Sequence, residues 1–340
     1  MRLALLAATT VVGLSVAGCS EDDVTLYVAL DQTHSEALVR DFEAETGLKV
    51  NARFDTEASK TVGLVSAIVE EAERPRCDVF WNNELAHTVR LAQKGLLEAY
   101  ESPAAATIPA AYKDANGHWA GFAARARILI VNTELLADPS EYPTSMWDLL
   151  DPKWKGRCAV ARPLTGTTLT HFTALRFVLG EAEFERFWNG LVENEVAFLQ
   201  SNGATMREVA AGRYAFAFTD TDDFHVALKK GQPVGCVFPD QAEGQPGTML
   251  IPNSVAIVKN GPHPEAARKL VDWILSEQVE ARLAAARSAQ IPLRAGVEGP
   301  PAEQILALDA FRGMVWDPAV TAENLATMAE DFEKRLGQAP

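Results

Sequence analysis

The sequence is poor in cysteine and lacks the short motifs that mark common metal sites and hydrolases. Four cysteines occur in 340 residues, and no CxxC pair or His/Cys cluster indicates zinc. GxSxG and HExxH motifs are also missing. We therefore expect a protein that is not an enzyme. The alternative, an exported carboxylate-based hydrolase, has only adjacent acidic residues in its favour.

Positive charge is scarce as well. The chain has 31 Lys and Arg against 46 Asp and Glu, which gives a formal net charge of −15. No run of basic residues and no internal repeat is present. Proteins that bind nucleic acid present a surplus of Lys and Arg on one face. We therefore expect no nucleic-acid partner.

Long apolar runs are confined to the first twenty residues. Residues 1–19 contain one arginine, then an apolar stretch, then small residues before Cys19, which is the layout of a secretory signal. The ending "VAGC" resembles the lipobox of bacterial lipoproteins. That resemblance implies a signal peptide over 1–18, a lipid on Cys19 and an acidic tether over 19–23. No later window has the ~20 apolar residues of a membrane span. We expect an exported protein, periplasmic or at the cell surface, with a soluble body anchored to a membrane by lipid. A plain signal peptide is the alternative.

Three further cysteines remain in the mature chain. An exported compartment permits a disulfide, and both Cys158 and Cys236 lie in predicted strands. A bridge between these two is one possibility. Three small buried thiols, with Cys77 as the third, are the favoured alternative.

Segments typical of strands and helices alternate along the chain. Residues 23–30 predict a strand, and 34–47 predict a helix in which Leu38 and Phe42 lie on one face. More strands are expected at 48–54, 77–81, 156–163, 213–218 and 233–238. Helices are expected at 60–75, 84–95, 165–180, 201–212, 222–231 and 264–276. This alternation is typical of an α/β fold with a parallel sheet.

Two extended segments, 117–136 and 247–258, interrupt the alternation. Two α/β blocks joined by such segments predict two lobes with a cleft between them. The chain is expected to cross between lobes near 122–127 and to return near 243–250. We assign 24–123 plus 248–300 to lobe 1 and 124–247 plus 301–340 to lobe 2.

Several segments in order along the mature chain resemble a known family. They are "YVALDQTHSEALVRDFEAETGLKV", "DVFWNNE", "LAQKGLLEAY", "RARILIVNT", "SMWDLLDPKWKGRCAVARPLTGTT", "NSVAIVKNGPHPEAARKLVDWILS" and "IPLR". Together they are similar to the ferric-ion-binding group of bacterial ABC-importer substrate-binding proteins. The resemblance implies a two-lobed periplasmic-binding-protein fold of type II that closes on its ligand. It also implies a monomer without a cofactor, which delivers the ligand to an ABC permease and its ATPase.

Polar residues follow four predicted strands. Ligands of open α/β sheets bind outside the carboxyl ends of the strands. The first two segments are "ALDQTH", with Asp31 and Gln32, and "VFWNNE". In the second, Trp81 can wall a pocket, and its polar neighbours can bind oxygen or nitrogen groups: Asn82, Asn83 and Glu84. Helix capping is the alternative at both segments. The resemblance places an acidic iron ligand at Asn83 or Glu84.

The third segment, "PLTGTT", ends a strand and begins a helix. Gly166 permits close backbone approach, hydroxyl groups add donors (Thr165, Thr167 and Thr168), and a helix N-terminus is a natural anion site. The resembled family holds its accompanying anion, phosphate or carbonate, at this position. It also often supplies an arginine near the lobe crossing, which makes Arg125 and Arg127 candidates.

The fourth segment, "TDTDD", places Asp220, Thr221, Asp222 and Asp223 directly after an apolar strand. Capping explains one or two of these carboxylates, but three repel one another, so a ligand site is the favoured hypothesis. We expect unpaired carboxylates that face a cation. Asp31, Glu84, Asp222 and Asp223 are the candidate metal ligands.

The same segment departs from the resembled family, whose members carry two adjacent tyrosines here as ferric ligands. In this chain Thr and Asp replace them, and Tyr214 lies within the strand. Carboxylates are hard donors that suit Fe³⁺. Fe³⁺ with a synergistic anion is the first ligand hypothesis. The alternative is a small anionic or zwitterionic organic solute, such as an aminophosphonate or organophosphate. A sensor or adhesion module with the same fold is a further alternative.

Overall fold

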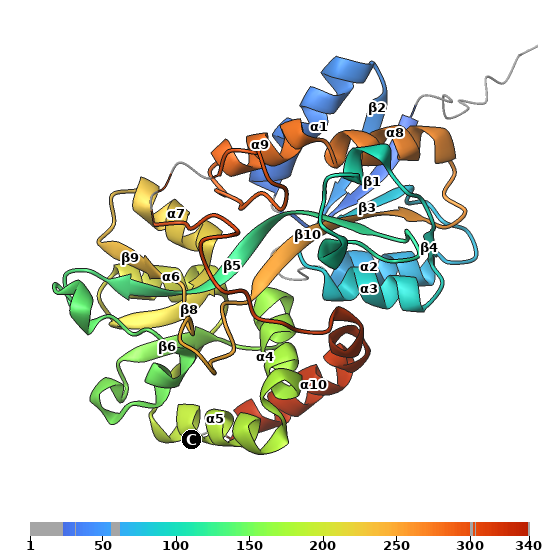
Figure 1. Ribbon diagram of the computed structural model, residues 1–340. Helices are drawn as coiled ribbons and strands as arrows, with labels where there is room; N and C mark the ends of the chain where they lie inside the picture. The colour runs from blue at the N-terminus through green and yellow to red at the C-terminus, as the bar shows by residue number, and fades with distance from the viewer. Residues whose placement is uncertain (1–22, 31, 56–61, 300–301, 303, 339–340) are drawn as a thin grey trace, which may run out of the picture.

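The computed structural model describes residues 23–30, 32–55, 62–299, 302 and 304–338 (Figure 1). The predicted signal peptide, Cys19 and Asp31 lie outside these residues. Among the described residues, every helix is too short or too polar to span a bilayer.

The strands form one mixed ten-stranded sheet in two halves. Its order is β2-β1-β3-β10-β5-β8-β6-β7, with β4 on β10 and β9 on β5. The first half contains β1 (Asp23–Val28), β2 (Lys49–Phe54), β3 (Val79–Asn82), β4 (Leu97–Glu98) and β10 (Leu250–Val258). The second half contains β6 (Cys158–Ala161), β7 (Ala197–Leu199), β8 (Phe216–Asp220) and β9 (Val234–Val237). The predicted α/β class is confirmed, although β10 and β5 (Ala120–Asn132) make the sheet mixed rather than purely parallel.

Strand β5 joins the two halves. It pairs with β10 as far as Ala126, and from Arg127 onward it pairs antiparallel with β8. A β-bulge interrupts its pairing with β10 between Pro252 and Asn253. Opposite the bulge, Ala123 has a φ of +35°, and its N–H donates to the buried Glu280 carboxylate at 2.7 Å. The two arginines of β5, Arg125 and Arg127, lie where the pairing of this strand changes from β10 to β8, which is where the two halves meet.

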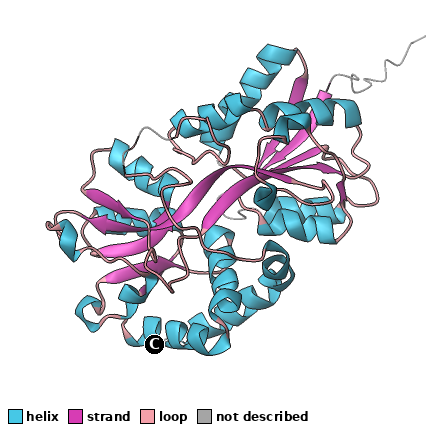
Figure 2. Ribbon diagram, in the orientation of Figure 1, coloured by secondary structure: helices cyan, strands magenta, loops and turns pink. Residues whose placement is uncertain are grey.

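Helices cover both faces of each half (Figure 2). In the first half, one face is covered by α1 (Gln32–Thr46), α8 (Pro264–Ile274) and α9 (Glu277–Ala285), and the other by α2 (Val62–Glu70) and α3 (Ala86–Gln93). In the second half, α4 (Gly166–Leu179), α5 (Glu181–Glu193) and α10 (Pro318–Gln338) lie opposite α6 (Asn202–Ala210) and α7 (Thr221–Lys229). Short 3₁₀ turns are present at Pro103–Ala105, Ala110–Tyr112, Pro139–Glu141, Met146–Leu150 and Pro152–Trp154. Helix α5 and strand β7 are elements that the sequence pattern did not indicate.

The last helix links the halves. Helix α10 packs against both α3 and α4 (Figure 1). Its Ala322 belongs to the core beneath α3, whereas Leu325 and Phe332 belong to the core beneath α4. The halves are therefore connected by packed side chains as well as by the crossing strands.

The suggested disulfide is absent, because the two cysteines lie on strands that are not neighbours. Cys236 on β9 pairs with Ile130 of β5, whereas Cys158 on β6 pairs with Phe216 of β8. Two strands separate them, about 14 Å at the usual spacing of strands, and a disulfide needs Cα atoms within about 7 Å. Cys77, Cys158 and Cys236 are all free thiols.

A buried carboxyl group makes the stability of the fold depend on pH. Burial raises the pKa of Asp240 to about 6, although hydrogen bonds from Ser145 and Met146 lower it. Since this pKa exceeds that of the unfolded chain, the contribution of the protonated group is complete below about pH 4. It is then lost as the pH rises through about 6.

We expect Asp240→Asn to remove this pH dependence. Asn is neutral at every pH, retains an acceptor and tolerates the φ of +63° at this position. Relative to the wild type, the variant should gain roughly 2–3 kcal/mol of unfolding free energy between about pH 4 and pH 8. Urea unfolding across this range measures the difference, and parallel profiles would contradict the assignment.

Candidate functional site

A cavity of about 460 Å³ lies at the carboxyl ends of the central strands. Its lining comes mainly from the segments that follow β6, β7 and β8: 165–168, 200–203, Asp220, Asp222 and Asp223. Asn83, which follows β3, and Arg125 of β5 contribute from the junction of the two halves. This position is the usual ligand-binding edge of an open α/β sheet.

Three helices begin at this cavity. Helix α4 starts at Gly166, whose φ of +59° favours glycine, and its N-cap residue Thr165 makes no side-chain capping bond. The Ser201 hydroxyl caps α6 by accepting from the N–H of Ala204 at 3.1 Å. The first turn of α7 contains Asp222 and Asp223, which complement the dipole of that helix. The uncapped start of α4 is therefore the strongest anion-binding feature of the three.

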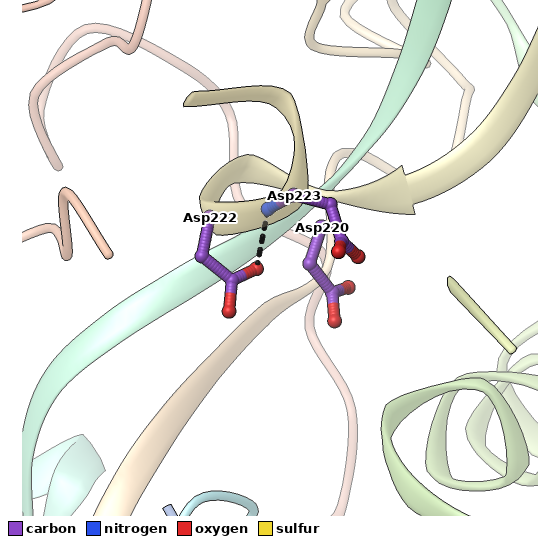
Figure 3. A group of neighbouring side chains, drawn as sticks. All are labelled: Asp220, Asp222 and Asp223. Atoms are coloured by element: carbon purple, nitrogen blue, oxygen red, sulfur yellow. Dashed lines mark hydrogen bonds between the residues drawn. The ribbon is translucent and has the colours of Figure 1, made fainter. Parts of the chain in front are cut away.

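The three aspartates of "TDTDD" converge, as Figure 3 shows. One carboxylate oxygen of each lies within 4.8 Å of the others. The expectation that these carboxylates are unpaired is wrong. Arg127 Nη1 lies 2.6 Å from Asp220 Oδ1, and Arg125 Nη1 lies 3.6 Å from Asp222 Oδ2. Antiparallel pairing of β5 with β8 sets Arg127 directly opposite Asp220.

Asp220 is bound from several sides. Its Oδ2 accepts hydrogen bonds from Thr167 Oγ1 at 2.7 Å and from Asn202 Nδ2 at 3.1 Å. Burial raises the pKa of Asp220, the guanidinium groups of Arg127 and Arg125 lower it, and the net shift is below the usual value. The side chain is therefore an ionised member of a buried network, although it borders the cavity.

The threonine hydroxyls of "TGTT" are also directed into the protein. Thr167 donates to Asp220, and Thr168 Oγ1 donates to Asn202 Oδ1 at 2.9 Å. Both residues and Thr165 border the cavity as predicted, but the hydroxyls of Thr167 and Thr168 are not the ligand donors that we expected. Thr221 is likewise structural, because its buried hydroxyl accepts from the N–H of Ala126 at 3.2 Å.

Basic side chains outnumber acidic ones around the cavity. Three carboxylates border it, against five cationic side chains: Arg125, Arg162, Arg207, Lys230 and Arg287. Arg125 is buried and donates to the carbonyl of Asn83, whereas the other four are exposed. The lining is thus basic within a chain whose formal net charge is −15. Sequence inspection missed the four exposed cations because they come from four separate segments.

The segment that follows β3 is largely structural. Trp81 is 1 % exposed and packs against Phe122 with ring centroids 5.4 Å apart, so the prediction that it walls the pocket is wrong. Asn82 is buried and donates to Glu84 and Thr88. Of this group, only Asn83 borders the cavity.

Glu84 lies two residues before the first residue of helix α3, Ala86, and does not face the cavity. Its fully buried carboxylate accepts from the N–H groups of Ala86 and His87 at 3.0 and 2.8 Å. It also accepts from Thr170 of α4 at 2.8 Å. The metal-ligand hypothesis for Glu84 is therefore wrong, and the capping alternative is right.

Two further predicted residues, Arg127 and Gln32, are not in the lining. Arg127 is fully buried behind the cavity as the partner of Asp220. Gln32 is exposed at the start of α1, where its amide lies 3.4 Å from Glu36. The metal hypothesis for Asp31 concerns a residue that is not described.

Comparison with known proteins identifies the class. Residues 37–306 match the family model described as bacterial extracellular solute-binding protein. The chain belongs to this family. The prediction of an extracellular substrate-binding protein with an α/β periplasmic-binding fold is thereby confirmed.

Three similar proteins have names that bear on the ligand. Iron uptake protein A1 of Synechocystis is 29 % identical over 82 % of this chain and 77 % of its own. A periplasmic protein of Salmonella typhi, provisionally named for binding 2-aminoethylphosphonate, is 24 % identical over 94 % and 93 %. The crystal structure of iron-bound HitA from Pseudomonas aeruginosa has a TM-score of 0.80 and 26 % identity, covering 91 % of this chain and 99 % of HitA.

Glu84→Gln tests the structural role of Glu84 in this solute-binding protein. Replacing a buried carboxylate that accepts hydrogen bonds should lower the unfolding free energy by about 1–3 kcal/mol. Affinity for a bound solute should not change. Chemical unfolding and calorimetry measure the two effects, with the exposed Glu36→Gln as control. A selective loss of affinity would restore Glu84 as a ligand.

Proposed function

We propose that this protein captures a small solute for an ABC importer and that the solute presents an anionic group to the cavity. The carrying observation is that the lining is basic where three helices begin. With the solute bound, the protein would close its lobes around it and dock on a permease driven by an ATPase. Binding proteins with this fold close by hinge motion about their connecting strands.

An organic anion or zwitterion suits the arrangement of charges best. Phosphate, phosphonate or carboxylate oxygens would accept from the start of α4 and from Arg125, in the manner of other helix-terminus anion sites. Asp222 and Asp223, in the first turn of α7, would then face an amino or hydroxyl group of the same solute. The relative named for 2-aminoethylphosphonate supports this ligand class.

Ferric iron accompanied by an anion is the second candidate. The closeness of the carboxylate oxygens and the iron-binding relatives favour it. Asp220 gives its oxygens to Arg127, Thr167 and Asn202. A metal would therefore draw on Asp222 and Asp223, which border the cavity, in competition with Arg125 and the Thr219 hydroxyl. A trivalent cation next to five cationic side chains requires a compensating anion, so iron would enter as an anionic complex.

Two further features belong to the proposal. The protein acts by binding and release, without catalysis, because its relatives are binding and uptake proteins. The mature chain is lipid-anchored at Cys19 and works as a monomer, which the "VAGC" ending and the family resemblance support.

Anions without metal should stabilise the purified protein. We expect 2-aminoethylphosphonate, and more weakly inorganic phosphate, to raise the melting temperature, because the basic lining attracts negative charge. Ferric chloride alone should have no effect, and ferric citrate should act only if iron is a cargo. Calorimetry with each compound decides among them. Stabilisation by the metal alone would contradict the anion proposal.

The cation at the rim provides a variant for the same experiment. Arg207→Gln should weaken anion binding about ten- to a hundredfold, since a charge-assisted contact contributes about 1.5–3 kcal/mol. Arg213→Gln is the matched control, because Arg213 is exposed near the end of α6 but does not border the cavity. Equal effects of the two substitutions would indicate only a general change of charge.

Cys19→Ala tests the anchor. Without the thiol that carries the lipid, the exported protein should move from the membrane fraction to the soluble fraction. Fractionation and mass spectrometry of the mature N-terminus measure the change. A wild-type protein that is already soluble and begins upstream of Cys19 would disprove lipidation.

A further inference from the structure

We propose that Asp220 and Arg127 are positioning residues that hold the N-terminal turns of α4 and α6 in fixed relation at the cavity. This inference rests on the proposed function, because the two turns are the anion-facing part of the site. It gives the central carboxylate of "TDTDD" a role distinct from that of a ligand. Asp222 and Asp223 retain the role of facing the solute.

The contacts form a continuous chain across four elements. Arg127 on β5 lies 2.6 Å from Asp220 at the end of β8. Asp220 accepts from Thr167 in the first turn of α4 and from Asn202 at the first position of α6. Asn202 in turn donates to Thr167 Oγ1 at 2.8 Å and accepts from Thr168 at 2.9 Å. One carboxylate therefore joins both helix starts to the strand that links the halves.

The burial of this network separates positioning from ligand contact. Arg127 is fully buried, Asp220 is 4 % exposed, and the hydroxyls of Thr167 and Thr168 are committed to partners within the network. What these contacts leave for a ligand is the backbone at the start of α4, which has no side-chain cap. Small displacements of groups that hold a ligand lower affinity strongly, so a rigid second layer is effective here.

Arg127 is itself oriented by a neutral histidine. Burial lowers the pKa of His171 well below its usual range, and the neighbouring Arg127 lowers it further. The neutral ring can accept from Arg127 Nε, which lies 3.4 Å from His171 Nδ1. His171 follows Thr167 by four residues on the same face of α4. The helix thus contacts both members of the ion pair, one turn apart.

The test uses Thr167→Val, which removes the hydroxyl that donates to Asp220 but keeps the backbone N–H. Asp220→Asn removes the charge. Thr173→Val is the matched control, because Thr173 is a buried threonine of the same helix whose hydroxyl has no hydrogen-bond partner among the described residues. Leu270→Ala in α8 is a destabilised control outside the second half of the sheet.

Hydrogen exchange of the unliganded proteins gives the first readout. Thr167→Val and Asp220→Asn should each accelerate amide exchange at least tenfold at the first amides of α4 and α6 that are hydrogen-bonded to a backbone carbonyl, Leu169 and Thr205. The two controls should change amide exchange at these positions by no more than their change in the free energy of unfolding accounts for. Faster exchange confined to α4 in Thr167→Val would overturn the inference. If Asp220→Asn does not fold, Arg127→Lys takes its place, because Thr167→Val also removes the direct contact between Asn202 and Thr167.

Affinity for 2-aminoethylphosphonate and inorganic phosphate gives the second readout. Each single variant should bind at least tenfold more weakly than the wild type. The double variant should be no weaker than the poorer single variant, because both act through one network. Normal affinity in the single variants, with a wild type that binds, would overturn the inference. A wild type that binds neither anion would instead refute the proposed ligand. Hydrogen exchange would still test whether Asp220 and Arg127 position the two helix starts.

Discussion

The ion pair between Arg127 and Asp220 is the interaction on which the site depends. It exists because β5 changes partner at Arg127, leaving β10 and pairing antiparallel with β8. The same change of partner joins the two halves of the sheet. The residues at which the chain crosses between the halves are therefore also the residues that build the site. A charged pair at this depth carries a large desolvation cost, and the hydrogen bonds from Thr167 and Asn202 offset part of it.

Charge is distributed unevenly in this molecule. The chain is acidic as a whole, yet its central cavity is bordered by more cations than carboxylates. In a partly enclosed cavity, nearby charges govern which ligand enters, because solvent and salt screen the distant surface. Three converging helix starts add to the same field. The acidic residues of α7 weaken this positive field and make one side of the cavity negative. A site with two signs of charge favours a ligand that also has two.

The relation between structural capping and ligand binding differs among the four strand ends. The Glu84 carboxylate accepts from the N–H groups at the start of α3 and from Thr170 of α4. The segment in which the resemblance placed an acidic iron ligand therefore connects two helices. At "TGTT" the cap is missing, and the helix start remains available to a ligand. The same sequence signal, polar residues after a buried strand, therefore has opposite meanings at these two places.

The sequence by itself determined the class of fold, the crossing strand, the family and two of the segments that line the cavity. These follow from local periodicity and from residues at strand ends, such as "TGTT" and "TDTDD", whose neighbours in sequence are their neighbours in space. Only the tertiary structure decided how those residues are used. Arg127 is nearly a hundred positions from Asp220, and strand pairing brings the two together. Four separate segments bring the exposed cations to the rim of the cavity. Glu84 and Trp81 lost their predicted roles because packing buried them, and the cysteines stayed apart because two strands lie between them. Each of these outcomes depends on long-range pairing, which a pattern of neighbouring residues does not encode.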